Sequence, residues 1–127
     1  MRQLRVLIID DDPALRRVLE RAVLRQGHEP VLASDGDEAR TLARTESVDV
    51  VLMDLRIPGT AGKLLYEAML ADRPELQGCV IVMSGDTQTD NGEEWFGQRG
   101  VPVLAKPFDL LELLETIERV AAERAVE

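Results

Sequence analysis

The sequence predicts an α/β domain of the doubly wound, flavodoxin-like class, with five parallel strands in one sheet. Short apolar runs alternate with longer segments of helical periodicity along the 127 residues. Parallel strands need crossover connections, which are right-handed, so this alternation indicates a sheet covered by helices. The expected strand order is 2-1-3-4-5, which is common in such sheets. No repeat or linker interrupts the pattern, so residues 1–127 are interpreted as a single domain with its core at about residues 5–121.

The first strand and helix are marked by a clear boundary. Residues 5–10 form an apolar run, and Asp12-Pro13 follows as a helix cap with proline at the first helical position. Gly27 is the expected end of this helix. Its apolar side chains recur at helical spacing at Leu15, Val18, Leu19, Ala22 and Val23.

The next two units are marked by turn residues. Pro30 to Ala33 reads as a short strand, and Asp35 and Glu38 have the spacing of a capping box for a helix through Arg44. The third strand, Val48 to Asp54, is the most apolar. A turn from Pro58 to Gly62 then leads to a helix that ends at Pro74 and carries Leu64, Leu65, Ala68 and Met69.

The last two units contain the weakest helix. Val80 to Ser84 is the fourth strand, and the polar stretch from Gly85 to Glu94 predicts a short fourth helix with a mobile entry loop. Residues 101–105 form the last strand, where Pro102 indicates an edge position. Residues 122–127 read as a frayed end or as the beginning of a connection to another segment. The helix that begins at Asp109 should bury a stripe of Leu110, Leu113, Leu114, Ile117, Val120 and Ala121.

Composition excludes several classes of function. The net charge of −9 and the pI near 4.6 argue against nucleic-acid binding by this domain alone, because such binding depends on clustered Lys and Arg. No apolar run reaches the length of a membrane span, so a cytoplasmic protein is expected. The single cysteine, Cys79, opens an apolar run and reads as a buried hydrophobe rather than a reactive thiol.

Four of the predicted strands end at residues suited to phosphoryl chemistry. Because the carboxyl ends of parallel strands meet at one edge, these residues should converge on one crevice. They are Asp10 and Asp11, Asp54, Ser84 and Lys106. This set could transfer a phosphoryl group to an aspartate, with Asp54 as the nucleophile and Ser84 and Lys106 binding its oxygens.

The acidic residues also predict a divalent cation. Like charges about 4 Å apart repel by about 4 kcal/mol at an effective dielectric constant near 20, so three carboxylates need a counter-charge. Mg²⁺ fits best, because it prefers carboxylates, water and phosphate oxygens, and no His or Cys cluster favours zinc.

Taken singly, these residues have ordinary explanations. Asp12 is explained as a helix cap, while a strand-end Ser84 or an edge Lys106 would be unremarkable alone. His28 follows the helix-ending Gly27 and is interpreted as a solvated turn residue rather than a phosphocarrier. Trp95 and Phe96, in the predicted fourth helix, could either contact a partner or pack within the domain.

Together, the motifs resemble the receiver domain of two-component response regulators. The resemblance rests on Asp10-Asp11, VLMDLRIPG around Asp54, VIVMSGD around Ser84, and VLAKPFD around Lys106. It covers the chain from about Arg5 to Arg119, with the motifs in order. Each motif alone is weak, whereas the ordered set is specific.

The resemblance implies a phosphorelay function. Asp54 would accept a phosphoryl group from a phosphohistidine of a sensor histidine kinase or a histidine phosphotransfer protein. Mg²⁺, or Mn²⁺ in its place, would be held by Asp11, Asp54 and the backbone carbonyl of Arg56, with Asp10 acting through water. The Lys106-Pro107 bond would be cis. A weak dimer would form through the fourth helix, fifth strand and fifth helix.

One departure from the family concerns the switch. Val103 stands where the family commonly has Tyr or Phe, so an aromatic flip cannot report phosphorylation here. We hypothesise that the signal passes through Ser84, the loop that follows it and the fourth helix, with Trp95 as a probe. Asp86 is expected to pair with Arg56 across the mouth of the pocket and to affect dephosphorylation.

Three other interpretations compete with a stand-alone regulator. The chain could be a receiver excised from a hybrid histidine kinase, which its GVPVLAKPFD run resembles. It could be a haloacid-dehalogenase-like phosphatase, but that family has a second acid two residues after the nucleophile, where this chain has Arg56. It could also be an interaction domain that works without phosphorylation. The receiver interpretation predicts no enzyme activity beyond self-phosphorylation and self-dephosphorylation at Asp54.

Overall fold

The computed structural model describes residues 3–57, 60–85 and 92–126, and its centre is a parallel five-stranded sheet. The strands are β1 (Arg5–Ile9), β2 (Glu29–Ala33), β3 (Val50–Asp54), β6 (Val80–Ser84) and β7 (Val103–Ala105). They lie in the order β2-β1-β3-β6-β7. Counted along the chain this is 2-1-3-4-5, so the predicted order is confirmed. The edge position that Pro102 indicated for the last strand is confirmed too.

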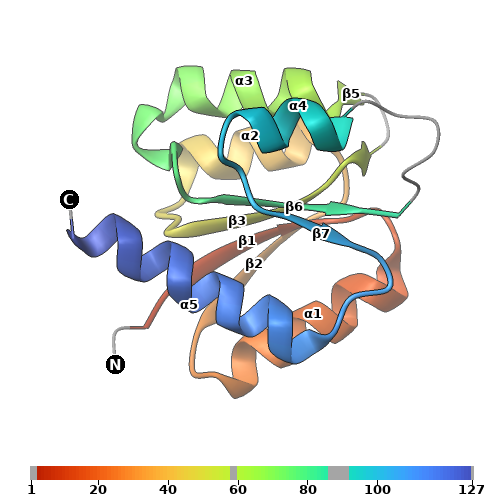
Figure 1. Cartoon of the computed structure of the whole chain (residues 1–127), viewed down its shortest axis with the longest axis vertical. Coiled ribbons are helices and arrows are strands. Elements are labelled where there is room, and N and C mark those ends of the chain that lie inside the picture. Colours follow the sequence, from red (N-terminus) through yellow and green to blue (C-terminus); the bar gives the residue numbers. More distant parts are fainter. Residues whose placement is uncertain (1–2, 58–59, 86–91, 127) are drawn as a thin grey trace.

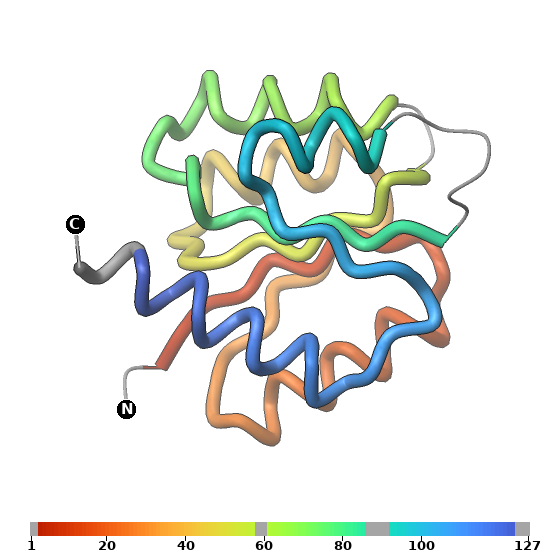
Figure 2. The backbone as a smooth tube through the Cα atoms, viewed as in Figure 1, coloured from red at the N-terminus to blue at the C-terminus, as the bar shows by residue number. Residues whose placement is uncertain are grey.

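Helices cover both faces of this sheet (Figure 1). Helices α1 (Pro13–Arg25) and α5 (Leu110–Val126) lie on one face. The other face carries α2 (Gly36–Thr45), α3 (Gly62–Asp72) and α4 (Gly92–Gln98). A short 3₁₀ helix, η1 (Pro74–Leu76), follows α3. Figure 2 follows the chain from each strand through a helix to the next strand.

Each face of the sheet buries its own apolar core, because successive strand residues point to opposite sides. The core under α2, α3 and α4, here called the α2–α4 core, contains Leu7, Ile9, Val51, Met53, Val82, Leu65, Met69 and Phe96. The core under α1 and α5, here called the α1/α5 core, contains Val6, Ile8, Leu52, Ile81, Met83, Leu19, Leu113 and Ile117. Cys79 is fully buried in the α1/α5 core, which confirms its reading as a hydrophobe.

The predicted helix caps are present, with one difference. The Asp12 carboxylate accepts from the backbone N–H groups of Ala14 and Leu15, as expected for an N-cap. Asp35 caps α2 by accepting from the N–H of Glu38 at 2.8 Å. The Glu38 carboxylate reaches one residue further back than a capping box requires and accepts from the Ser34 N–H at 2.7 Å.

Several predicted details are wrong. A small antiparallel pair, β4 (Arg56–Ile57) and β5 (Thr60–Ala61), forms where only a turn was expected. The last helix continues to Val126 rather than fraying at residue 122. Leu110 was assigned to a buried stripe but is 38% exposed. It lies in the first turn of α5 and lines an open groove with Val18 and Ala22 of α1, which leaves it partly accessible to solvent.

The solvated position predicted for His28 is also wrong. The imidazole is 3% exposed, because Gly27, at a φ of +83°, reverses the chain after α1. The backbone N–H of Leu4 donates to His28 Nδ1 at 3.0 Å. Since Nδ1 accepts, Nε2 carries the proton and donates to Glu118 Oε1 at 2.7 Å. His28 therefore joins the start of β1 to α5.

Three aromatic rings form a cluster between α3 and α4. Tyr66 lies edge-on to Trp95 and Phe96, with ring centroids 5.8 and 5.2 Å apart. Phe96 is fully buried. Trp95 is partly buried against the α2–α4 core, and the guanidinium of Arg99 stacks 3.6 Å from its ring centroid. Of the two roles left open for Trp95 and Phe96, the structure supports packing.

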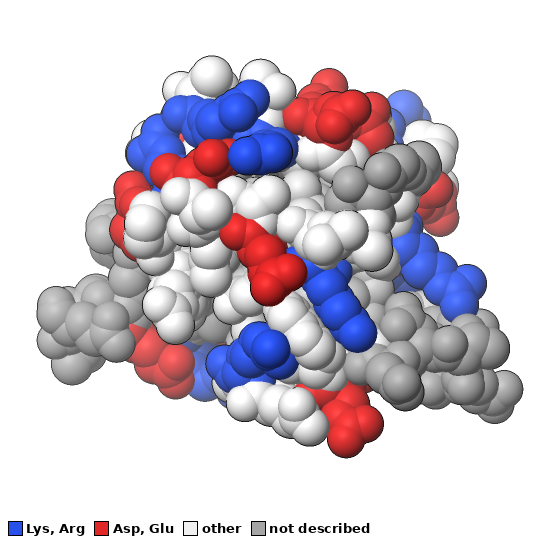
Figure 3. All heavy atoms as spheres, turned by 90° about the horizontal axis from the view of Figure 1, so that it is seen from above, with Lys and Arg blue, Asp and Glu red and all other residues white. Residues whose placement is uncertain are grey.

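The surface over α3 and α4 carries charges of both signs. Figure 3, which looks on to this side, shows groups of Lys and Arg side chains separated by groups of Asp and Glu. Among the described residues, none of the helices has both the length and the apolar character needed to cross a membrane.

Candidate functional site

The carboxyl ends of four strands meet at one edge of the sheet, as predicted. Backbone hydrogen bonds tie neighbouring ends together: the N–H of Leu55, after β3, donates to Met83 O of β6, and the N–H of Lys106, after β7, donates to Ser84 O. Three of the polar side chains are almost completely enclosed, with exposed fractions of 0% for Asp10, 5% for Asp54 and 2% for Ser84. Rigid strands therefore position the polar side chains at this edge.

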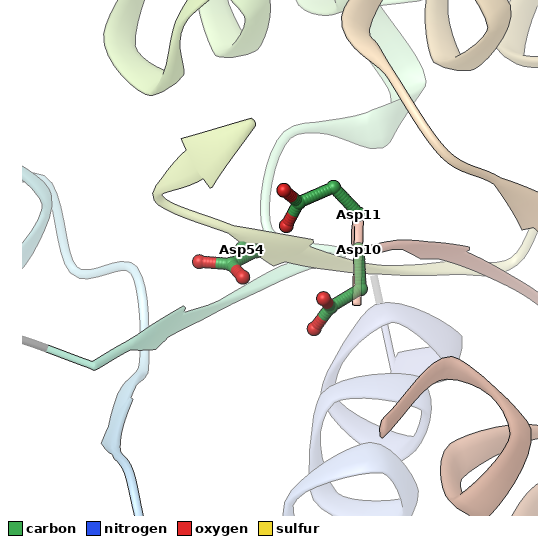
Figure 4. A group of neighbouring side chains, drawn as sticks. All are labelled: Asp10, Asp11 and Asp54. Carbon is green, nitrogen blue, oxygen red and sulfur yellow. The ribbon is translucent and has the colours of Figure 1, made fainter. Parts of the chain in front are cut away.

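Three carboxylates face a common space beyond β1 and β3. Asp10 and Asp11 follow β1, Asp54 ends β3, and all three project to the same side of the sheet edge (Figure 4). Each offers one oxygen, and these oxygens all lie within 4.8 Å of one another. Asp11 is exposed and the other two are buried, so the cluster is open to solvent on the Asp11 side. Clustered carboxylate oxygens of this kind suit a hard divalent cation.

Lys106 supplies the positive charge of the site. Its Nζ donates to Asp54 Oδ2 at 2.8 Å and to Asp10 Oδ2 at 3.5 Å. Burial alone would lower the pKa of Lys106, but the hydrogen bond and charge of Asp54, with those of Asp10, outweigh it and the pKa is raised. The ammonium is therefore fixed in its charged form beside Asp54.

Both oxygens of Asp54 have partners in this structure. Oδ2 accepts from Lys106, and Oδ1 accepts from the backbone N–H of Arg56 at 3.0 Å. The second contact folds residues 54–56 into a tight turn, so the Arg56 backbone lies beside the carboxylate. The Arg56 side chain is exposed.

Burial makes the Asp10 carboxyl harder to ionise. Burial raises the pKa of its carboxyl, and the Asp54 charge adds to this, although the N–H of Asp12 and the Lys106 charge oppose it. The Asp12 N–H donates to Asp10 Oδ1 at 2.9 Å. The Asp10 carboxylate is therefore fixed by contacts on both oxygens and remains costly to ionise.

We expect Asp10→Asn to stabilise the magnesium-free protein at neutral pH. Because the pKa of Asp10 is higher in the folded chain than in the unfolded chain, the folded chain holds this proton more tightly. Stability is therefore lost as the pH rises from the unfolded pKa through the folded pKa. The gain from Asn should therefore be largest at neutral pH and shrink as the pH falls towards the ordinary carboxyl range. Urea unfolding in EDTA at several pH values measures it.

Asp12→Asn is the control for this experiment. Asp12 is exposed, and Asn caps a helix about as well as Asp, so this variant should have about the same free energy of unfolding as the wild type. If the difference in unfolding free energy between Asp10→Asn and wild type were the same at every pH, the idea that burial penalises the Asp10 charge would be wrong.

The structure describes most of the other residues predicted for the site and its switch. The Lys106-Pro107 bond is cis, as expected. Val103 and Trp95 are both partly buried against the α2–α4 core. Asp86 lies outside the described residues, so its pairing with Arg56 stays a prediction.

One contact at the site was missed by the sequence analysis. The guanidinium of Arg16, on α1, donates from Nη1 to the backbone carbonyl of Asp10 at 2.8 Å. A signal was available, because a cation near the start of a helix opposes the helix dipole and so needs a local reason.

The fold and this site together define a doubly wound α/β domain with an acidic cluster that could hold a cation, beside a fixed lysine. Comparison with known families makes the class specific. The model of the response regulator receiver domain matches residues 6–118, and the chain belongs to this family. Receiver domains bind Mg²⁺ and work with histidine kinases in two-component signalling, and in this chain Asp10, Asp11 and Asp54 form a cluster that could hold a metal ion.

The chain matches a relative of about its own length and a relative that is much longer. Protein PilH of Pseudomonas aeruginosa is 35% identical over 120 residues, which cover 93% of this chain and 98% of PilH. The DNA-binding transcriptional regulator NtrC of Salmonella typhimurium is 32% identical over 114 residues, 90% of this chain. The chain spans only 24% of the length of NtrC.

Solved structures confirm the fold. The structure of a CheY-like response regulator receiver domain protein from Methanospirillum hungatei matches with a TM-score of 0.87 and 25% identity, covering 98% of both chains.

Proposed function

We propose that Asp54 accepts a phosphoryl group from a phosphohistidine of a sensor histidine kinase or a histidine phosphotransfer protein. The observation that carries this proposal is the 2.8 Å contact between Lys106 Nζ and Asp54 Oδ2 inside the acid cluster. A carboxylate nucleophile needs a cation that can stabilise the incoming phosphoryl oxygens, and Lys106 is already in contact with it.

The donor set fits Mg²⁺, and Mn²⁺ is expected to substitute. Asp11, Asp54 and the backbone carbonyl of Arg56 would hold the ion, with Asp10 acting through water. When bound, the ion would neutralise charge on the carboxylate and phosphoryl oxygens. The exposed Asp11 lies on the open side of the cluster, where an ion can enter from solvent.

In the proposed transfer, an oxygen of Asp54 attacks phosphorus and the phosphorus–nitrogen bond of the phosphohistidine breaks. The imidazole nitrogen leaves with the bonding electron pair and takes up a proton from solvent. Lys106 passes from the carboxylate to a phosphoryl oxygen, and the Ser84 hydroxyl donates to another. Attack of water on phosphorus later releases phosphate and restores the Asp54 carboxylate.

We propose that the signal leaves the site through Ser84 and α4. Val103 cannot act as a rotating aromatic reporter, whereas α4 is short and is joined to α3 through the contact of Tyr66 with Trp95 and Phe96. Movement of Ser84 towards the phosphoryl group would shift this contact. The face made by α4, β7 and α5 would then present a changed surface to a partner, or form the weak dimer suggested above.

Labelling with acetyl phosphate tests this function. With Mg²⁺, the wild-type chain should gain the mass of one phosphoryl group and its Trp95 emission should change, while EDTA or Asp54→Asn should prevent both. Labelling with unchanged emission would reject the route through α4. No labelling of folded wild type would reject the phosphoacceptor role and favour an interaction domain that works without phosphorylation.

The phosphatase alternative has a separate test. The acid that such an enzyme would need two residues after Asp54 is absent, since Arg56 occupies that position. A receiver should therefore not turn over a generic phosphate monoester. Steady turnover that Asp54→Asn abolishes would favour the enzyme. PilH is matched along 98% of its length, which agrees with a stand-alone regulator, and the receiver excised from a hybrid histidine kinase stays a proposal beside it.

A further inference from the structure

We propose that Arg16 is a positioning residue for the metal site, because it fixes the loop that carries Asp11. This inference rests on the proposed function. Its basis is the 2.8 Å hydrogen bond from Arg16 Nη1 to the backbone carbonyl of Asp10, the residue directly before Asp11. Arg16 touches none of the carboxylate oxygens in the contacts that the structure gives, so it would act through the loop.

The loop between β1 and α1 is held at several points. The N–H of Asp10 donates to Ala33 O at 3.1 Å, and its carboxylate accepts from the N–H of Asp12 at 2.9 Å. Asp12 is itself fixed as the cap of α1. Arg16 holds the one remaining polar backbone group of Asp10, its carbonyl. Asp11 therefore lies between two residues that are held by hydrogen bonds.

The position of Arg16 on α1 is unfavourable for a cation unless its side chain makes a compensating contact. Arg16 is near the amino end of α1, where a positive charge opposes the helix dipole. Its side chain points back past the cap to Asp10, in the direction that side chains take on a helix. It also brings one positive charge to a loop of three consecutive aspartates.

Arg16 and Arg17 differ in contact but not in charge. Arg17 is the next residue on α1 and is exposed, whereas Arg16 is half-buried. Removing either charge should by itself tighten Mg²⁺ binding slightly, because the ion is repelled by one cation fewer. Removing a positioning contact should weaken binding. The sign of the change therefore separates the two effects.

The test compares Arg16→Met with Arg17→Met by calorimetric titration of Mg²⁺, with urea unfolding in EDTA to confirm the fold. Methionine keeps most of the aliphatic side chain of arginine. We expect Arg16→Met to raise the Kd for Mg²⁺ about tenfold, as for other residues that orient metal ligands. Arg17→Met should leave it unchanged or slightly lower. Arg16→Lys, which keeps a donor for the Asp10 carbonyl, should recover part of the lost affinity.

Two outcomes would overturn the inference. Equal Kd values for Arg16→Met and Arg17→Met would show that only charge matters, and a Lys variant as weak as the Met variant would exclude the hydrogen bond. Asp11→Asn distinguishes failure of the proposed function. If the wild type binds no Mg²⁺, or binds it equally well with Asp11→Asn, the acid cluster is not the metal site, and both proposals fail.

Discussion

Lys106→Met is expected to slow phosphorylation of Asp54 by about a hundredfold, the loss seen when one preorganised donor to a developing charge is removed. The same change should strengthen Mg²⁺ binding. Lys106 occupies Asp54 Oδ2 at 2.8 Å and also contacts Asp10 Oδ2. Without it, three carboxylates face the ion with no competing cation. The rate of phosphoryl transfer should therefore fall while the affinity for Mg²⁺ rises.

The rate of labelling by acetyl phosphate at saturating Mg²⁺, followed by intact mass, measures the first effect, and calorimetry measures the second. Lys63→Met is the matched control, because Lys63 is the only other lysine and lies on α3 beside Trp95. It should alter neither quantity. Weaker Mg²⁺ binding in Lys106→Met would show that the lysine shapes the site rather than competing for its carboxylates.

His28→Ala is expected to lower the free energy of unfolding by about 3 kcal/mol. The change leaves the Leu4 N–H without its acceptor in a buried setting, which costs about 1–3 kcal/mol. It also leaves a cavity where a ring that is 3% exposed had packed, and buried large-to-small changes cost about 2–5 kcal/mol. These two costs overlap, so their full sum is not expected.

Urea denaturation in EDTA measures this loss, with Glu118→Ala as the comparison. Glu118 accepts from the same ring, but its side chain is 41% exposed, so this hydrogen bond should contribute about 1 kcal/mol or less. A loss in Glu118→Ala as large as that in His28→Ala would show that the contact with α5 stabilises the fold, rather than the bond to Leu4.

The strands and the site could be predicted because local signals fix both. Buried parallel strands read as apolar runs, and their ends fall at Asp54, Ser84 and just before Lys106. Since parallel strands share one carboxyl edge, the sequence positions imply the spatial cluster without any knowledge of side-chain conformations. The caps at Asp12 and Asp35 were readable for the same reason, because they depend on neighbours within a few residues.

The features that were missed depend on contacts distant in sequence or on side-chain direction. His28 is buried because Leu4 and Glu118, which are 24 and 90 residues away, enclose it. No local pattern around Gly27 contains that information. The contact from Arg16 to Asp10 spans only six residues, but it depends on the direction of a long side chain. The β4–β5 pair is too short to show an alternating pattern.

The aromatic cluster between α3 and α4 determines what spectroscopy of this chain reports. The sequence has one Trp, one Tyr and two Phe, and only Phe108 packs against the α1/α5 core instead. Near-ultraviolet circular dichroism therefore reports almost entirely on one corner of the molecule. If that corner melts first, its transition will precede the loss of helical signal at far-ultraviolet wavelengths. Coincidence of the two transitions is thus a direct test of whether α4 unfolds with the rest of the domain.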